Sequence, residues 1–227
     1  NMNRHVAMDP FTTTWWICIL TVASIITTII LLPKYFNWAS SKIYPKILAA
    51  ILLTNLIVEN IYSYSTNKWS IQYSLPLHMC GMSVLMSILV LFKYNTKIAH
   101  LVFYWGRTGG IYSLLTPEFD QGDQGFFFYS YFIGHGGLIL TCLYLFIHNK
   151  FRPESNSWLR IFMYTQFAAL AVGTFNWATG SNYMYLITPP TVNNPLIIGN
   201  WPWYILFFEA LAIVHFYLFY RLSRVWK

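Results

Sequence analysis

Charged side chains are scarce in this chain of 227 residues, and that scarcity is the first constraint on its fold. Only 9% of the residues are Asp, Glu, Lys or Arg, whereas 56% are hydrophobic; a soluble domain carries roughly 25% charged residues. The formal charge of +7 does not indicate a nucleic-acid partner, because the basic residues are scattered in short segments between apolar runs. The composition therefore excludes an ordinary soluble protein and indicates one that crosses a membrane several times.

Cysteine is also scarce, and a leader sequence is not evident. The three cysteines, Cys18, Cys80 and Cys142, all lie in apolar runs without the spacing of metal ligands. We therefore expect neither a disulfide nor a metal site, and nothing indicates a cofactor. The first apolar run lacks a basic flank before it and a small-residue cleavage site after it. We expect this run to remain in the protein as a membrane helix.

Long apolar runs are what the chain has in abundance. A run of about 20 residues crosses a bilayer as a helix, and the connectors between the runs are short. We therefore expect an all-α protein with a single membrane domain, a bundle of seven transmembrane helices over residues 1–227. The seven runs cover residues 13–33, 44–63, 76–92, 97–116, 126–148, 158–178 and 202–221, approximately.

The distribution of Lys and Arg over the connectors predicts the orientation, because cytoplasmic loops carry an excess of basic residues. Eleven fall on one side of the seven runs, against Arg4 and Lys68 on the other. The amino terminus is therefore expected outside and the carboxyl terminus in the cytoplasm. The eleven are Lys34, Lys42, Lys46, Lys93, Lys97, Lys150, Arg152, Arg160, Arg221, Arg224 and Lys227.

Six hydrophilic side chains lie inside these runs or at their ends, where a charge at membrane depth is costly and usually functional. With the expected orientation, each lies within about ten residues of the outer boundary, or about 15 Å at the helical rise. We therefore expect one polar pocket beneath the outer face that brings all six together. They are Glu59, His78, Arg107, His135, Asn176 and Glu209.

Residues 74–80 (SLPLHMC) open the third run and combine a histidine with a cysteine. Ser before Pro signals a helix start, with Pro76 in the first turn. His78 and Cys80 would then lie near the positive end of the helix dipole, which suits a neutral base and a sulfur nucleophile. Residues two apart on a helix point in nearly opposite directions. Cys80 therefore pairs with His78 only through a distorted turn, or with a histidine of another helix, and simple core packing is the alternative.

Glycines lie beside two further polar side chains, which lets neighbouring helices approach closely. His135 lies in the segment 134–137 (GHGG), and we interpret it as a site residue; the alternative is a histidine that bonds a backbone carbonyl and fixes helix packing. Arg107 lies in the segment 105–110 (WGRTGG) and needs an anionic partner. Glu59, Glu209 and a lipid phosphate are the candidates, since guanidinium binds phosphate through paired hydrogen bonds.

The remaining polar residues divide into two groups. Asn55 lies four residues before Glu59, so both project from one helix face. The uncharged aromatic loop around Asn182 and Tyr183 either covers the pocket as a lid or lies on the outer leaflet as an aromatic belt. The others lie towards the inner side, and we interpret them as packing residues: Cys18, His100, Cys142, His148 and His215.

Six short segments, in order, resemble a known family over residues from about 70 to 205. The chain is similar to the YwaF-type integral membrane proteins and the related transmembrane protein 164 group. This resemblance implies an acyltransferase that acts on phospholipid acyl chains through a Cys and a His, with the nucleophile at Cys80 and the base at His78 or His135. The segments are 75–80 (LPLHMC), 104–107 (YWGR) with 115–118 (LTPE), 134–136 (GHG), 151–153 (FRP), 182–186 (NYMYL) and 201–204 (WPWY).

We therefore predict a multi-pass plasma-membrane enzyme, an acyltransferase or acyl hydrolase whose partner is a membrane phospholipid or another acyl lipid. The catalytic residues would be Cys80 with His78 or His135, with Arg107 and Asn176 on the phosphate or the oxyanion. The rival hypothesis is a non-enzymatic carrier, channel or lipid-binding protein with an ionisable pathway, which the lack of an internal repeat disfavours. The predicted substrate-binding residues are Arg107, Asn176, Glu59, Glu209, Asn182 and Tyr183.

Overall fold

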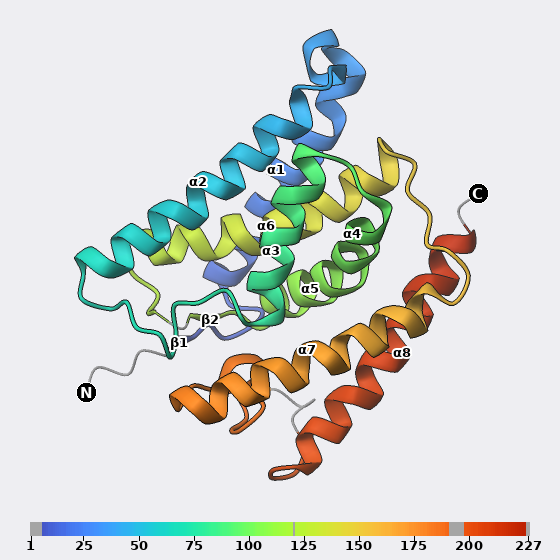
Figure 1. Cartoon of the computed structure of the whole chain (residues 1–227). Coiled ribbons are helices and arrows are strands. Elements are labelled where there is room, and N and C mark those ends of the chain that lie inside the picture. Colours follow the sequence, from blue (N-terminus) through green and yellow to red (C-terminus); the bar gives the residue numbers. More distant parts are fainter. Residues whose placement is uncertain (1–5, 120, 191–197, 226–227) are drawn as a thin grey trace.

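The computed structural model describes residues 6–119, 121–190 and 198–225, and helices make up most of these ranges (Figure 1). Two short strands, β1 (Val6–Ala7) and β2 (Glu118–Phe119), pair antiparallel. The helices are α1 (Thr13–Tyr35), α2 (Tyr44–Ser65), α3 (Met79–Phe92), α4 (Thr96–Leu101), α5 (Arg107–Leu115), α6 (Phe126–Ile147), α7 (Ser157–Thr179) and α8 (Trp203–Val225), with the short turns η1 (Asn37–Ser40), η2 (Val102–Gly106) and η3 (Tyr183–Tyr185).

The prediction of an all-α membrane protein is confirmed. Each predicted apolar run coincides with a helical segment, and the boundaries differ by only a few residues. In the described part of the chain, α1, α2, α6 and α8 are long and apolar enough to cross a membrane, and α3 is a shorter apolar helix. The length of the apolar runs was therefore a sound guide to the helices.

The predicted start of the third helix is wrong. Pro76 does not lie in the first turn of α3; the helix begins at Met79, and His78 is its N-cap with an extended backbone (φ −66°, ψ 151°). The proline backbone packs over the beginning of the helix instead, because a Cβ at Gly81 would lie 2.8 Å from Pro76 Cα. The chain before α3 is thereby held against the helix rather than continuing it.

Helix α6 lies at the centre of the bundle and contacts α1, α2, α3 and α5. Glycines allow these contacts to be close. A Cβ at Gly136 would lie 3.0 Å from Val22 of α1, and one at Gly110 of α5 would lie 2.8 Å from Ile139 of α6. Small residues at helix contacts are the usual means of tight packing in membranes, where lipid tails are as apolar as the helix surfaces. Gly136 and Gly137, which follow His135, therefore have the packing role expected from the sequence, whereas a Cβ at Gly134 would meet nothing within 4 Å.

The fourth apolar run contains an irregular helical turn at its middle. Between α4 and α5, η2 has π-helical geometry, and its residues are buried. Two of its aromatic side chains bond α7 across the interface: Trp105 Nε1 donates to Thr165 Oγ1 at 2.8 Å, and Tyr104 Oη lies 2.8 Å from Ser157 Oγ. The wide turn is thus one of the places where α7 is joined to the rest of the bundle.

Helices α7 and α8 pack against each other and lie along one side of the bundle (Figure 1). Gln166 of α7 donates a hydrogen bond of 2.6 Å to the carboxylate of Glu209 of α8. Tyr104 of η2 packs on Phe216 of α8, with ring centroids 5.1 Å apart. An amide–carboxylate pair and an aromatic cluster therefore hold the two helices together and to the bundle.

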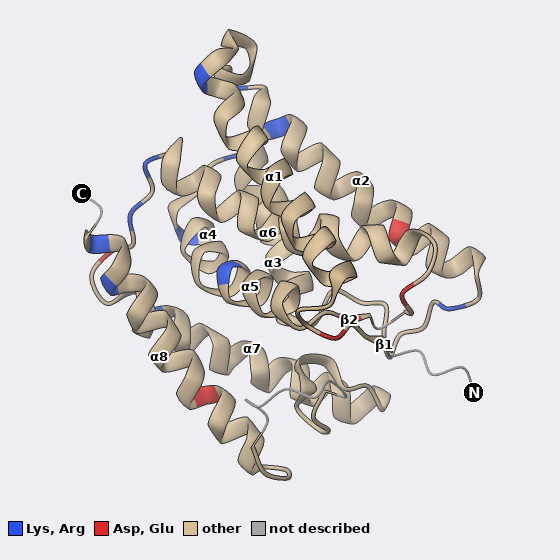
Figure 2. Cartoon of the chain, turned by 180° about the vertical axis from the view of Figure 1, so that it is seen from behind, with Lys and Arg blue, Asp and Glu red and all other residues tan. Residues whose placement is uncertain are grey.

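Most Lys and Arg residues lie towards one end of the bundle (Figure 2). Lys and Arg mark the end that contains the α1–α2 connection, the chain between α6 and α7 and the last turns of α8. The opposite end, around β1 and β2, contains red segments together with one blue segment in the chain that follows α2. This distribution agrees with the asymmetry of Lys and Arg in the sequence.

The close contact of α5 with α6 can be tested by adding single methyl groups. The substitution Gly110→Ala places a Cβ 2.8 Å from Ile139 Cδ1 and 3.2 Å from the His135 carbonyl oxygen. We expect it to lower the free energy of unfolding by about 1–3 kcal/mol, as overpacking does. Thermal unfolding of purified protein in detergent measures the loss.

Gly134→Ala is the matched control, since a Cβ there meets nothing within 4 Å. Both substitutions replace a helical glycine, so the gain in helix propensity is common to the two. We expect Gly134→Ala to retain or raise the unfolding temperature. Equal behaviour of the two variants would contradict close packing at Gly110.

Candidate functional site

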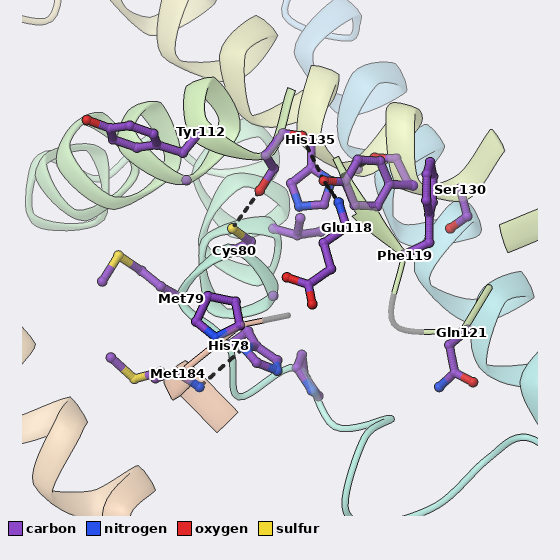
Figure 3. Close-up of a pocket in the computed structure, with 18 of the residues that line it drawn as sticks. His78, Met79, Cys80, Tyr112, Glu118, Phe119, Gln121, Ser130, His135 and Met184 are labelled. Carbon is purple, nitrogen blue, oxygen red and sulfur yellow. Dashed lines mark hydrogen bonds between the residues drawn. The ribbon is translucent and has the colours of Figure 1, made fainter. Parts of the chain in front are cut away.

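A cavity of about 500 Å³ lies in the bundle, with walls from α2, α3, α5, α6 and α8 (Figure 3). Residues of β2 and of the segment 180–190, which we call the strap, complete its lining. Apolar side chains such as Leu56, Val84 and Phe208 line it together with ionisable ones. The ionisable lining residues include Glu59, His78, Cys80, Glu118, His135 and His215.

Cys80 lies in the first turn of α3, and its sulfur faces α5. The Sγ atom lies 3.6 Å from Ser113 Oγ, and a Cβ at Gly109 would lie 2.7 Å from the same sulfur. The first hydrogen bond of the helix runs from Met82 N to the His78 carbonyl oxygen at 3.0 Å. The backbone amides at positions 79–81 therefore precede the first rung of the helix, where N–H groups and the dipole favour negative charge.

His135 presents a proton-accepting nitrogen. Its Nδ1 lies 2.8 Å from the carbonyl oxygen of Tyr131, one turn earlier in α6. A carbonyl can only accept, so Nδ1 carries a hydrogen and the neutral ring has its lone pair on Nε2. The Tyr131 ring packs beside the imidazole, with centroids 4.2 Å apart. The bond to the carbonyl thus fixes both the orientation of the ring and its tautomer.

His78 has the opposite tautomer. The backbone N–H of Met184 donates to its Nδ1 at 3.2 Å, so the neutral ring carries its hydrogen on Nε2. The rings of Tyr183 and Tyr185 flank the imidazole, at centroid distances of 5.2 and 5.1 Å. His78 therefore offers a hydrogen-bond donor, whereas His135 offers an acceptor. Their arrangement assigns the two histidines different chemical roles.

Glu118 is a member of the site that the sequence reasoning missed. Its carboxylate points into the cavity between His78 and His135 in Figure 3. The Tyr185 hydroxyl of the strap donates to Oε2 at 3.3 Å, and the Glu118 backbone N–H donates to Tyr131 Oη at the same distance. Glu118 is not among the site residues that the sequence predicted. The segment 115–118 (LTPE) was nevertheless one of the family-like segments.

The α2 side of the cavity contains a second polar group. Ser130 Oγ of α6 donates to Glu59 Oε2 at 2.5 Å, and Asn55 Nδ2 donates to Ser130 Oγ at 3.0 Å. Asn55 and Glu59 share a face of α2, as their spacing predicted. These polar groups therefore face the same cavity as Cys80 and the histidines.

The expectation of a single pocket for all six hydrophilic residues is only partly correct. Glu59, His78 and His135 line the cavity, whereas Arg107, Asn176 and Glu209 do not. The guanidinium of Arg107 packs on aromatic rings, with Cζ 4.1 Å from the Phe219 centroid. Position along an apolar run does not tell in which direction each side chain points, because that depends on how the helix is rotated about its axis. Neither Arg107 nor Asn176 lines this cavity, and their expected role on the phosphate or the oxyanion stays a prediction.

Asn176 instead anchors the strap. Its Nδ2 donates to the Tyr183 carbonyl oxygen at 2.8 Å, and its Oδ1 accepts from the Tyr183 N–H at 3.0 Å. Tyr183 Oη then donates to the Ile71 carbonyl and accepts from the Leu75 N–H. Asn182 bonds within the strap, to Thr188. These contacts place Met184 and Tyr185 against the cavity, and the loop folds back over it as one of the two sequence interpretations expected.

The strap backbone is strained where it meets the cavity. Met184 and Tyr185 have φ values of 57° and 53°, in the left-handed region that costs about 1–3 kcal/mol for a non-glycine residue. The Tyr204 hydroxyl donates to the Tyr185 carbonyl oxygen at 2.6 Å. The anchors from α7, α8 and His78 therefore offset the cost of this conformation.

His215 also lines the cavity, although the sequence favoured a packing role. Its Nε2 lies 2.6 Å from Tyr112 Oη, and its Nδ1 lies 2.7 Å from the Leu211 carbonyl oxygen. His100 and His148 bond backbone groups away from the cavity. Over the ranges that the structure describes, no group of three or more His, Cys, Asp and Glu side chains is placed to hold a metal ion.

The comparison with known families identifies the chain. The family model of the TMEM164 family matches residues 10–220. The chain belongs to the TMEM164 family. The match covers every helix of the structure except the last turns of α8, so the whole cavity of this TMEM164-family protein lies within it. No curated protein and no solved structure matches the chain.

The anchoring role of Asn176 can be tested by hydrogen exchange. In Asn176→Ala, both backbone groups of Tyr183 lose their amide partner, and a buried unpaired group costs about 1–3 kcal/mol. We expect the exchange of the Tyr183 amide to accelerate about tenfold or more. Exchange measured by mass spectrometry on peptides that cover 180–186 reports this change.

Asn182→Ala is the control, because within the described residues the Asn182 side chain bonds strap residues 187 and 188 and not Tyr183. In Asn182→Ala, the hydrogen-exchange rate of the Tyr183 amide should stay close to its rate in the unsubstituted protein. Unaltered protection of Tyr183 in Asn176→Ala would refute the anchoring role.

Proposed function

We propose that this TMEM164-family protein is a lipid acyltransferase or acyl hydrolase with Cys80 as its nucleophile. The observation that carries the proposal is the placement of Cys80 in one cavity with two histidines of opposite tautomer and a carboxylate. A nucleophile, a proton acceptor and a hydrogen-bond donor are the parts that acyl transfer requires. The cavity also has apolar lining from α2, α3 and α8, which suits an acyl chain.

The proposed reaction has two steps. The sulfur of Cys80 bonds to the ester carbonyl carbon and its proton passes to His135 Nε2; the C–O bond then breaks as that proton goes to the leaving alcohol oxygen. In the second step water or an acceptor alcohol gives its proton to His135, takes the acyl group and restores the thiol. His135 is the base in this scheme because its Nδ1–H bond to Tyr131 leaves the lone pair on Nε2.

Negative charge that develops on the carbonyl oxygen needs hydrogen-bond donors. The amides at the beginning of α3 lie next to the sulfur, and helix N-termini stabilise such charge. His78 carries its hydrogen on Nε2 and lies at the N-cap of the same helix. We therefore propose that the first turn of α3 and His78, rather than Arg107 and Asn176, serve the oxyanion.

The proposal includes a position in the membrane. We infer seven crossings of the plasma membrane, with the amino terminus outside, from the seven helical segments and the concentration of Lys and Arg at one end of the bundle. Cys80 then lies near the outer boundary, at the depth of lipid ester groups. Phospholipids of the outer leaflet are the substrates that this placement supports.

Mass spectrometry of purified protein incubated with phospholipid tests the covalent route. We expect a mass increase of one acyl group on the peptide that contains Cys80, and none in Cys80→Ala. Cys142→Ala is the matched control, because Cys142 is buried and its Sγ faces the Val102 carbonyl oxygen. Lipid turnover at full rate by Cys80→Ala would refute the nucleophile. Ion or solute flux in proteoliposomes without any lipid conversion would instead favour the carrier hypothesis.

The different roles of the two histidines give a second test. We expect His135→Gln to lower the acylation rate by about 100-fold or more, the usual contribution of a general base. His78→Asn retains an oxygen that can accept from Met184 N–H, so the strap should stay in place and the loss should be smaller. Single-turnover acylation followed by mass spectrometry measures both rates. A larger loss in His78→Asn than in His135→Gln would reverse the assignment.

A further inference from the structure

One face of α2 carries polar side chains along the cavity for two turns. Asn55, Glu59 and Ser63 are spaced four residues apart, and all three line the cavity. A polar stripe on a membrane helix is costly and usually serves a ligand. The proposed acyl chemistry at Cys80 makes no use of these groups.

Two of these side chains have buried polar atoms that lack a hydrogen-bond partner in the described part of the chain. Asn55 is 9% exposed and Ser63 is 3% exposed, and Asn55 Oδ1 and Ser63 Oγ are both unpaired. The orientation of the Asn55 amide is fixed by its neighbour, since Nδ2 lies 3.4 Å from the Ser130 carbonyl oxygen, which can only accept. The oxygen of the amide is therefore the atom left without a donor.

The chain between β2 and α6 adds another acceptor. Gln121 lines the cavity, is 9% exposed, and has an unpaired Oε1. The backbone of Gln121 is held by Lys68, whose Nζ donates to the backbone carbonyl oxygen of Gln121 at 2.8 Å. Buried unpaired polar atoms cost free energy, so three of them along one cavity indicate that a ligand supplies the missing hydrogens.

We propose that Asn55, Ser63 and Gln121 form a subsite for a lipid head group that carries hydrogen-bond donors, either an ammonium or hydroxyls. Amide and hydroxyl oxygens beside the Glu59 carboxylate accept such donors. The subsite lies where α2 ends and α6 begins, next to the start of α3 that holds Cys80. The head group would therefore bind beside the reacting ester. This inference rests on the proposed function only in taking the ligand to be a lipid.

The subsite predicts selectivity for head groups that can donate hydrogen bonds. Lipids with identical acyl chains and ethanolamine, glycerol or choline head groups are added to the Cys80→Ala protein in detergent, and their binding is measured by native mass spectrometry. The Cys80→Ala background prevents covalent turnover, so failure of the acyl chemistry does not affect this result. We expect the ethanolamine or the glycerol lipid to bind about threefold to tenfold more tightly than the choline lipid, which has no head-group donor.

Ser63→Ala gives the sharper test, because it removes an unpaired buried hydroxyl. If the Ser63 hydroxyl has only a packing role, Ser63→Ala should keep or raise the free energy of unfolding, and the affinity for lipid should not change. We expect equal or higher stability together with a roughly threefold loss of affinity for the donor-bearing lipid and none for the choline lipid. Asn55→Leu should give the same pattern of selectivity. Ser87→Ala is the matched control, since Ser87 Oγ is also buried and unpaired but does not line the cavity.

Two results would overturn the subsite. One is equal affinity of the Cys80→Ala protein for the choline lipid and for both donor-bearing lipids. The other is unchanged selectivity in Ser63→Ala and Asn55→Leu. If no acyl adduct formed on Cys80 in the earlier experiment, this test would still be valid. It measures lipid affinity in the Cys80→Ala protein, whereas the earlier experiment measures covalent modification of Cys80.

Discussion

Two adjacent glycines of α5 determine which chemical groups can meet in the cavity. A side chain at Gly109 would collide with the sulfur of Cys80, and one at Gly110 would press on Ile139 and on the carbonyl of His135. Helices α3 and α6 can therefore both pack closely on α5. As a result, the thiol of Cys80 and the imidazole of His135 line the same cavity. Close backbone contact of this kind is a principal source of cohesion between helices in lipid. The proposed chemistry thus depends on the absence of two methyl groups.

The sequence was informative about helices because the bilayer constrains them so strongly. Backbone groups in hydrocarbon must bond within the segment, so an apolar run of sufficient length is almost certain to be helical. It was less informative about side-chain direction. Arg107 was expected in the site but lies against Phe219, while Cys80 reaches the cavity from a helix that starts later than Pro76 predicted. Rotation of a helix about its axis depends on packing, and packing is not readable from a run of apolar residues.

Several residues interpreted as ligand contacts instead hold the protein's own backbone. Asn176 has a donor and an acceptor on one rigid amide, and the structure uses both on Tyr183. Glu118, by contrast, belongs to the cavity but comes from a strand of two residues, too short to leave a periodic pattern in the sequence. Polar residues near a site therefore divide into those that face the cavity and those that build the segment covering it. The three-dimensional structure is needed to tell residues that face the cavity from residues that hold the segment over it.

The π-helical turn η2 has a consequence for the way this chain can vary. A wide turn accommodates one more residue than an α-helical turn, and each residue rotates the following helix by about 100°. The rotation of α5 about its own axis, relative to α4, therefore depends on the number of residues in η2. Deletion of one residue in η2 would leave an apolar run of nearly the same length. It would, however, rotate Gly109 and Gly110 of α5 away from Cys80 of α3 and Ile139 of α6. A change of length in this stretch would put the helix out of register with the site.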